Sequence, residues 1–349
     1  MNELFLGCLS LLLVANLWWG IKKLPKERWQ ILAAIPRKQA GDGSWQGINF
    51  TYYGLFNANA YILAVLLFLV LLKSTGAHTS AILISIGCII GCCAPASRFI
   101  ARLVEKKSYT FTVGGASFLG LLLAPPFFLF MHRLSVSMDT GSFNVAAALA
   151  ALTISYTLGE GLGRLACISF GCCYGKSIDA SSRLVRKIFS RHHACFEGKT
   201  KKVSYEGNLD GQPLIPVQAI TCALFTTTAL VGIAMFLHGA FVSSYLLPLC
   251  VTQSWRIISE FLRADFRGGG RLTVYQKMAF AGLLYGIGIA LLLPYSGETT
   301  VNLALALSQL WSPAAILLMQ LGWLAIFIYT GKSMITGSHI SFHVHQNLS

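Results

Sequence analysis

Two short segments place arginine beside acidic side chains at the ends of long apolar runs, and they are the segments best suited to chemistry. The first begins Glu160-Gly-Leu-Gly-Arg164. An arginine at membrane depth is costly unless it is paired or functional, so Arg164 is expected to bind an anion. The second holds Arg256, Glu260 and Arg263, and their spacing puts all three on one face if the segment is helical.

Two arginines on one face suit phosphate, because a guanidinium group offers parallel N–H donors to two phosphate oxygens. Glu260 lies between Arg256 and Arg263 and is expected to orient them. The alternative is an ion-paired helix end that anchors a span at the lipid headgroups. Gly114 and Gly115 open another apolar run, where the backbone N–H groups of a helix N-terminus can meet an anionic headgroup.

Thiol and imidazole side chains follow the first segment. They are Cys167, Cys172, Cys173, His192, His193 and Cys195. Their spacing matches no closed zinc pattern such as paired CxxC units, and adjacent cysteines also pack as small apolar side chains. We therefore predict reduced thiols, no metal site and no cofactor.

The rest of the chain is too apolar to build the surface of a soluble globular protein. Of its 349 residues, 55% are hydrophobic and 11% are charged, and the mean hydropathy is +0.63. Apolar runs of about 17 to 25 residues, long enough to cross a bilayer, recur along the sequence. We predict an all-α, polytopic membrane helix bundle with nine spans, at residues 3–19, 52–72, 81–97, 117–132, 143–160, 217–237, 241–258, 274–294 and 311–330.

Two of these spans are irregular, and the positive charges are one-sided. Pro125 and Pro126 interrupt the fourth span, and a glycine run at 159–163 is expected to end the fifth. If the spans alternate, every lysine and arginine except Lys73 and Arg133 falls on one face. The positive-inside rule makes that face cytoplasmic, with the N-terminus outside. Anionic headgroups account for the net charge of +14, so no nucleic-acid partner is expected.

Several motifs, taken in order, resemble those of the prolipoprotein diacylglyceryl transferase family from about residue 48 to about residue 290. Residues 50–55 resemble its aromatic-Tyr-Gly-Leu, and residues 114–118 its Gly-Gly-Met-Ser-Phe loop. Residues 163–176 resemble the signature Gly-Arg-x-x-Asn-Phe-x-Asn-x-Glu-x-x-Gly. Residues 216–218 resemble His-Pro-x-Gln, residues 255–263 resemble Arg-Phe-x-x-Glu-Phe-x-Arg, and Gln276 falls where a glutamine opens the last common span.

The resemblance implies a division of the chain into three parts. Residues 1–47 would form an additional span and a basic loop, and residues 295–349 an additional span and tail. Residues 48–294 would form the transferase-like core, with residues 175–215, rich in basic and turn-forming residues, as a small extramembrane cap.

The resemblance also implies a reaction and a set of site residues. Family members act in the cytoplasmic (inner) membrane. They move the diacylglyceryl group of phosphatidylglycerol to a cysteine thiol of a preprolipoprotein and release glycerol phosphate. Such a substitution needs a nucleophile and stabilisation of the departing phosphate. The predicted catalytic residues are Arg164, Arg256 and Glu260, and the predicted substrate-binding residues are Tyr53, Gly114, Gly115, Ser117, Gly163, Gly175, Gln218, Arg263 and Gln276.

The chain departs from the family motifs on the nucleophile side. Leu119 and Ile215 stand where the family has histidine. In the signature, the two asparagines are replaced by Cys167 and Phe170, and the glutamate by Cys172.

These departures leave three functions open, because a thiol acceptor with a pKa near 8.5 is helped by a nearby base. The first is transfer to a lipoprotein thiol with another base, such as Glu160 or Glu260. The second is a related lipid-modifying enzyme with a small, non-protein, cytosolic acceptor. The third is a non-catalytic membrane protein that binds or moves lipid.

Overall fold

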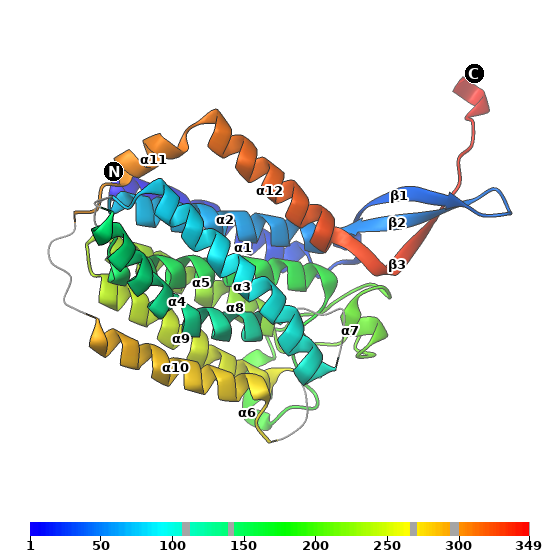
Figure 1. The fold of residues 1–349 in the computed structure, drawn as a ribbon. Coiled ribbons are helices and arrows are strands. Elements are labelled where there is room, and N and C mark those ends of the chain that lie inside the picture. The colour runs from blue at the N-terminus through cyan, green and yellow to red at the C-terminus, as the bar shows by residue number, and fades with distance from the viewer. Residues whose placement is uncertain (107–111, 139–142, 266–270, 294–299, 349) are drawn as a thin grey trace.

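The computed structural model describes residues 1–106, 112–138, 143–265, 271–293 and 300–348. Long helices dominate this part of the chain and run side by side in alternating directions (Figure 1). They are α1 (Asn2–Lys23), α2 (Tyr52–Ser74), α3 (Thr79–Glu105), α4 (Val113–Ser137), α5 (Val145–Phe170), α8 (Val217–Leu237), α9 (Phe241–Leu262), α10 (Val274–Leu292) and α12 (Pro313–Gly331). Each corresponds to one predicted span.

Eight of these helices are long and apolar enough to cross a membrane. The other one, α9, carries the polar side chains of Gln253, Arg256 and Glu260 in its second half and packs against α5, α8 and α10. The predicted all-α, polytopic membrane bundle is therefore confirmed. The predicted boundary between residues 294 and 295 lies outside the described residues.

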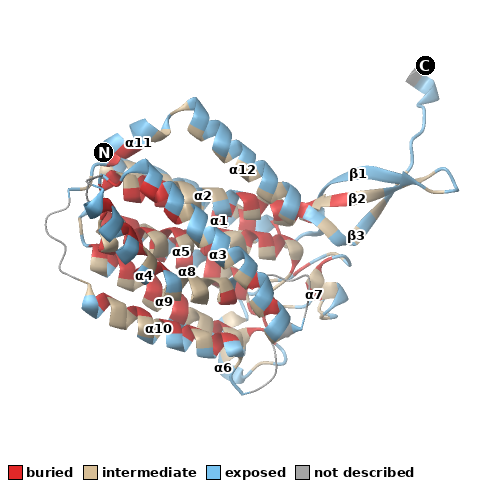
Figure 2. Cartoon of the chain, in the orientation of Figure 1, coloured by how far each residue is buried: buried red, intermediate tan, exposed pale blue. Residues whose placement is uncertain are grey.

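Helix α5 forms the centre of the bundle and packs against α2, α8 and α9. Figure 2 shows the buried residues concentrated in these inner helices, whereas α12 is largely exposed at the edge of the bundle. The prediction that the glycine run ends this span was wrong, because α5 continues to Phe170. The glycines let α8 approach closely instead: a Cβ on Gly161 would lie 3.1 Å from the Cβ of Phe225.

The basic segments gather at one end of the bundle. The predicted cap contains two short helices, α6 (Arg183–Phe189) and α7 (Lys202–Tyr205), which Figure 1 shows at the same end. Lys201 is fully buried there. Its Nζ donates to the carbonyl oxygens of Leu24, at 3.2 Å, and of Ser169, at 2.6 Å. This lysine therefore ties the cap to the chain just beyond α1 and to the last turn of α5.

A three-stranded antiparallel sheet projects beyond the same end of the bundle (Figure 1). It consists of β1 (Ile31–Gln39), β2 (Trp45–Thr51) and β3 (Lys332–Ile340), in the order β1-β2-β3. We predicted a basic loop before the second span and a tail after the last. The hairpin turns at Asp42 and Gly43, where the carboxylate accepts from the Ser44 backbone at 3.0 Å and Gly43 has φ 82°.

The C-terminal helix is packed onto the core of the chain. Helix α12 follows the short helix α11 (Leu303–Leu310) and lies against α2. At their ends, a Cβ on Gly54 would lie only 2.1 Å from the Cα of Gly331, so the two backbones touch there. Two single turns of 3₁₀ helix, Glu27–Trp29 and Gln346–Leu348, complete the described elements.

Candidate active site

A buried carboxylate on α5 holds two arginines together. Glu160 accepts from the Nη2 of Arg164, one turn later on the same helix, at 2.5 Å. Its other oxygen accepts from the Nη2 of Arg256 on α9, also at 2.5 Å. The Glu160 side chain is only 3% exposed. Since a buried charge needs partners, this ion triad fixes the relative positions of α5 and α9.

Polar groups from a third helix complete the surroundings of Arg256. Its Nη1 donates to the hydroxyl of Ser117 on α4 at 2.8 Å. Its Nη2 also donates to the hydroxyl of Tyr156, which in turn donates to Glu160. The Nε atoms of Arg164 and Arg256 are buried and have no hydrogen-bond partner among the described residues. Each guanidinium group therefore keeps an unused donor.

Arg263 reaches the same region from a different kind of backbone. Helix α9 ends at Leu262, and Arg263 is extended, with φ −86° and ψ 152°. The predicted helical stripe thus holds for Arg256 and Glu260 but not for Arg263. Its backbone forms an isolated antiparallel bridge with Gly175, where a Cβ would lie 2.2 Å from the carbonyl oxygen of Ile215.

Two acidic groups contact the Arg263 guanidinium. Its Nε and Nη2 donate to the two oxygens of Asp265, at 2.8 and 2.6 Å. Its Nη1 lies 3.9 Å from an oxygen of Glu260. Glu260 therefore contacts Arg263, whereas the carboxylate that holds Arg256 is Glu160.

The three arginines border one cavity near the cap end of the bundle. Arg164, Arg256 and Arg263 line it together with Glu160, Cys173, Val217, Gln218, Thr221, Phe225, Trp255 and Ser259. Trp255 donates its indole N–H to the hydroxyl of Thr221 at 2.7 Å, which fixes α9 against α8. Residues from three separate parts of the sequence thus meet around a single basic cavity.

A family model for prolipoprotein diacylglyceryl transferase matches residues 44–292, a range that contains every residue lining this cavity. The chain belongs to the prolipoprotein diacylglyceryl transferase family. The resemblance seen in the motifs is thereby confirmed, and it marks the chain as a multi-pass membrane protein of a transferase family. A comparison with curated proteins finds no match.

The other predicted substrate-binding residues lie around the cavity in different ways. Gln218 lines it and donates to the Cys172 carbonyl oxygen at 2.9 Å. A Cβ on Gly114 would lie 3.3 Å from Nη1 of Arg256, so this glycine gives the guanidinium room. Gly115 packs against Ile100 instead.

Three further predicted residues lie outside the cavity lining. The ring of Tyr53 packs against that of Phe170 in a tilted arrangement, with centroids 5.5 Å apart. Gly163 faces α2, where a Cβ would lie 3.9 Å from the Cβ of Ala60. Gln276 closes a capping box with Thr273 at the start of α10 and donates to the Ile257 carbonyl oxygen at 2.9 Å. Gln276 therefore positions α9 and α10.

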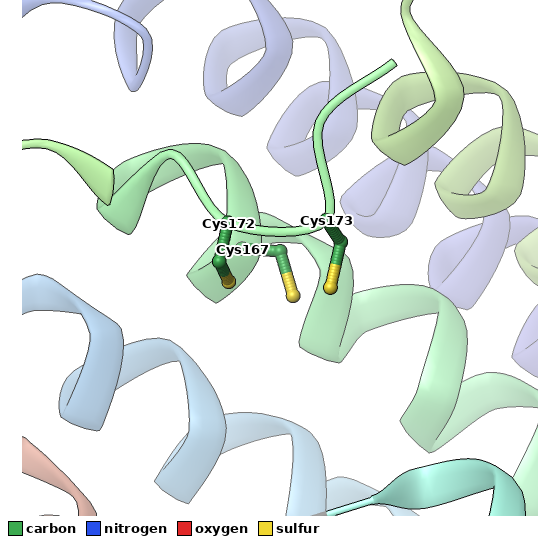
Figure 3. A group of neighbouring side chains, drawn as sticks. All are labelled: Cys167, Cys172 and Cys173. Atoms are coloured by element: carbon green, nitrogen blue, oxygen red, sulfur yellow. The ribbon is translucent and has the colours of Figure 1, made fainter. Parts of the chain in front are cut away.

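Three thiols from the transferase signature converge beside the arginines. The sulfur atoms of Cys167, Cys172 and Cys173 all lie within 4.8 Å of one another, and Figure 3 shows them pointing to one side of the loop that follows α5. His192, His193 and Cys195, downstream in the sequence, are not part of this group. Hydrogen bonds from the neighbouring thiols and the charges of Arg263 and Arg164 lower the pKa of Cys173 well below its usual range.

Sequence reasoning missed the central role of one residue and the presence of another. From the sequence, Glu160 is predicted only as an alternative base, and Tyr156 has no predicted role. Tyr156, Glu160 and Arg164 follow one another at intervals of four residues, which places them on one face of a helix. This spacing is the sequence signal that predicts a common site for the three residues.

Proposed function

We propose that the protein transfers the diacylglyceryl group of phosphatidylglycerol to a cysteine thiol of a preprolipoprotein in the cytoplasmic membrane. The observation that carries this proposal is the meeting of Arg164, Arg256 and Arg263 around one cavity. They come from two motifs that lie more than 90 residues apart. In a helical membrane protein of this family, such a cluster suits the phosphate of an anionic lipid.

The depth of the site suits a headgroup. Arg164 lies six residues before the end of α5, which at 1.5 Å per residue places it about 9 Å inside the helix end. The guanidinium groups are therefore within reach of the phosphate layer. The unused Nε donors of Arg164 and Arg256 offer hydrogen bonds to phosphate oxygens without removal of Glu160.

The chemistry that follows is a substitution at carbon. The acceptor thiolate attacks the carbon of the diacylglyceryl group that is bonded to a phosphate oxygen. A C–S bond forms at this carbon, and its C–O bond to the phosphate breaks. Glycerol phosphate leaves with the bonding electrons. Positive charge beside the departing oxygen lowers the barrier, because that charge is fixed in place before the reaction begins. Arg164, Arg256 and Arg263 supply it, and Gln218 and Ser117 hold their surroundings.

The test is a transfer assay with purified protein in vesicles containing phosphatidylglycerol. A peptide with one lipobox cysteine is added, and both glycerol phosphate release and peptide mass are followed. We expect coupled release and a gain of one diacylglyceryl group, and neither with a serine peptide. Release of glycerol phosphate without modification of the peptide would indicate that the acceptor is a small molecule or water and not a protein. Saturable lipid binding without release of glycerol phosphate would favour a non-catalytic membrane protein that binds or moves lipid.

A further inference from the structure

The three thiols lie in the segment that resembles the family signature, and two of them depart from it. Cys167 stands where the motif has asparagine and Cys172 where it has glutamate. Both replacements are cysteine, and their sulfur atoms lie within 4.8 Å of that of the third thiol, Cys173, on the same side of the loop. Three sulfur atoms within 4.8 Å of one another are close enough to share one ligand.

The backbone brings the three sulfurs together and holds them. Gly171, with φ 72°, reverses the chain at the end of α5, and the N–H groups of Gly171 and Cys172 both donate to the Cys167 carbonyl oxygen, at 2.8 and 3.1 Å. Cys173 has φ 58°, a conformation that costs free energy for a residue with a Cβ. Gln218 fixes the Cys172 carbonyl oxygen. The thiol loop is therefore preorganised.

We propose that Cys167, Cys172 and Cys173 form a three-thiolate site for Zn²⁺ whose fourth coordination position receives the acceptor thiol. A Zn–S bond is about 2.3 Å long, and tetrahedral geometry then separates two ligand sulfurs by about 3.8 Å. Sulfur atoms within 4.8 Å of one another reach that arrangement with small side-chain rotations. Three protein ligands and one exchangeable position are typical of catalytic zinc.

The charges around the cluster favour such a complex. Three thiolates and one Zn²⁺ carry a net charge of −1, and Cys173 lines the cavity beside Arg164 and Arg263. The nearby guanidinium groups therefore offset the charge of the site. The anionic metal complex would thus lie next to the arginines that are proposed to bind the lipid phosphate.

The role of the site follows from the missing histidines and rests on the proposed function. With Leu119 and Ile215 at those positions, neither can accept a proton from the acceptor. A thiol that binds zinc loses its proton to solvent. The zinc-bound thiolate then attacks the glyceryl carbon as the C–O bond to phosphate breaks, so that the metal replaces the base.

Metal binding is tested first, without reference to transfer. The full-length protein, purified without chelator and with its thiols reduced, is expected to hold about one zinc per chain. Exchange for Co²⁺ should give the intense thiolate-to-cobalt bands of a sulfur site. Cys167→Ser and Cys173→Ser should each weaken metal binding by about 10-fold or more. Cys195→Ser, outside the cluster, should bind metal as the wild type does.

Other results would overturn the site. Reduced wild-type protein that holds neither zinc nor cobalt contradicts it, as does unchanged binding in both cluster variants. Thermal unfolding of each variant in detergent shows whether a loss of metal reflects loss of fold, and a folded variant without metal supports the proposal.

The fourth position is tested on the cobalt protein with a peptide that carries one cysteine. Its binding should change the cobalt spectrum, and the serine peptide should not. A spectrum unchanged by saturating cysteine peptide would overturn the acceptor role while leaving the metal site in place. Because both measurements are spectroscopic, a failed transfer assay does not affect them.

Discussion

The arginines at the cavity come from two stretches of chain and the thiols beside them from one of these stretches, yet the two sides differ in how far they keep the family's residue types. Arg164, Arg256 and Arg263 match the motifs, whereas Cys167 and Cys172 replace an asparagine and a glutamate. Under the proposed function, this difference separates the residues that stabilise the departing phosphate from those that activate the acceptor. A divergent member can keep the first while rebuilding the second.

The two sides also differ in how they are held. Side-chain ion pairs hold the arginine side, through the buried Glu160 and through Asp265. Backbone geometry holds the thiol side, through the left-handed conformations of Gly171 and Cys173. Charge substitutions are therefore expected to disturb one side, and changes of backbone shape the other.

The largest effect is expected from replacing Arg164 on the arginine side. Arg164→Ala should lower the rate of glycerol phosphate release by about 10²–10³-fold, the range seen when a fixed transition-state donor is lost. Arg164→Lys should recover only part of the rate, since an ammonium group cannot donate in parallel to two oxygens. Arg186→Ala, in the cap, is the control and should stay within about twofold. An unchanged rate in Arg164→Ala would remove the arginine side from the reaction.

Removing the shared carboxylate tests what holds the arginine side. Glu160→Gln leaves Arg164 and Arg256 without their common counter-charge, and breaking a buried ion pair in this way costs about 3–5 kcal/mol. Thermal unfolding in detergent measures the loss. Glu206→Gln, which breaks the more exposed pair with Lys202, should cost under about 1 kcal/mol.

A second measurement on Glu160→Gln connects stability with lipid binding. Phosphatidylglycerol should raise the unfolding temperature of the variant more than that of the wild type, because a phosphate supplies the missing negative charge. Equal increments would mean that the lipid phosphate does not reach Arg164 and Arg256.

Backbone shape is tested at Gly175, whose bridge with Arg263 joins the thiol loop to the arginine side. Gly175→Ala places a Cβ 2.2 Å from the Ile215 carbonyl oxygen, so the loop must move, at a cost of about 1–3 kcal/mol. We expect lower stability together with a lower transfer rate, since Arg263 shifts with its bridge partner. Gly87→Ala, in α3 with nothing within 4 Å of the added Cβ, should be neutral or slightly stabilising. If both variants behave alike, the bridge does not position Arg263.

The spans were predictable because each consists of consecutive apolar residues in a run long enough to cross a membrane. The sheet was not predictable, because the residues of β3 pair with residues of β2 that lie 282 to 295 positions earlier in the chain, and no local sequence pattern identifies that partner. The end of α5 was misplaced for a related reason. Glycine disfavours an isolated helix, but here α8 packs into the space that Gly161 leaves.

Within the candidate site, the sequence supplied the arginines but not their pairing. Glu260 lies four residues after Arg256 in the sequence, whereas Glu160 lies 96 residues before it. The local sequence pattern therefore points to Glu260 as the partner of Arg256. The thiol group shows the same limit. Its spacing fits no zinc motif, and its members meet only because Gly171 turns the chain back on itself.

The last expected effect depends on pH and concerns Lys201, which supports the thiol loop through the Ser169 carbonyl oxygen. Burial lowers the pKa of Lys201 to about 8, from 10.5. Between these values the unfolded chain binds more protons than the folded one, so stability should rise with pH, by at most about 1.4 kcal/mol per pH unit. Thermal unfolding across this interval measures the rise. Lys201→Met should lack it and Lys202→Met should keep it, and a rise that persists in Lys201→Met would assign the titration to another group.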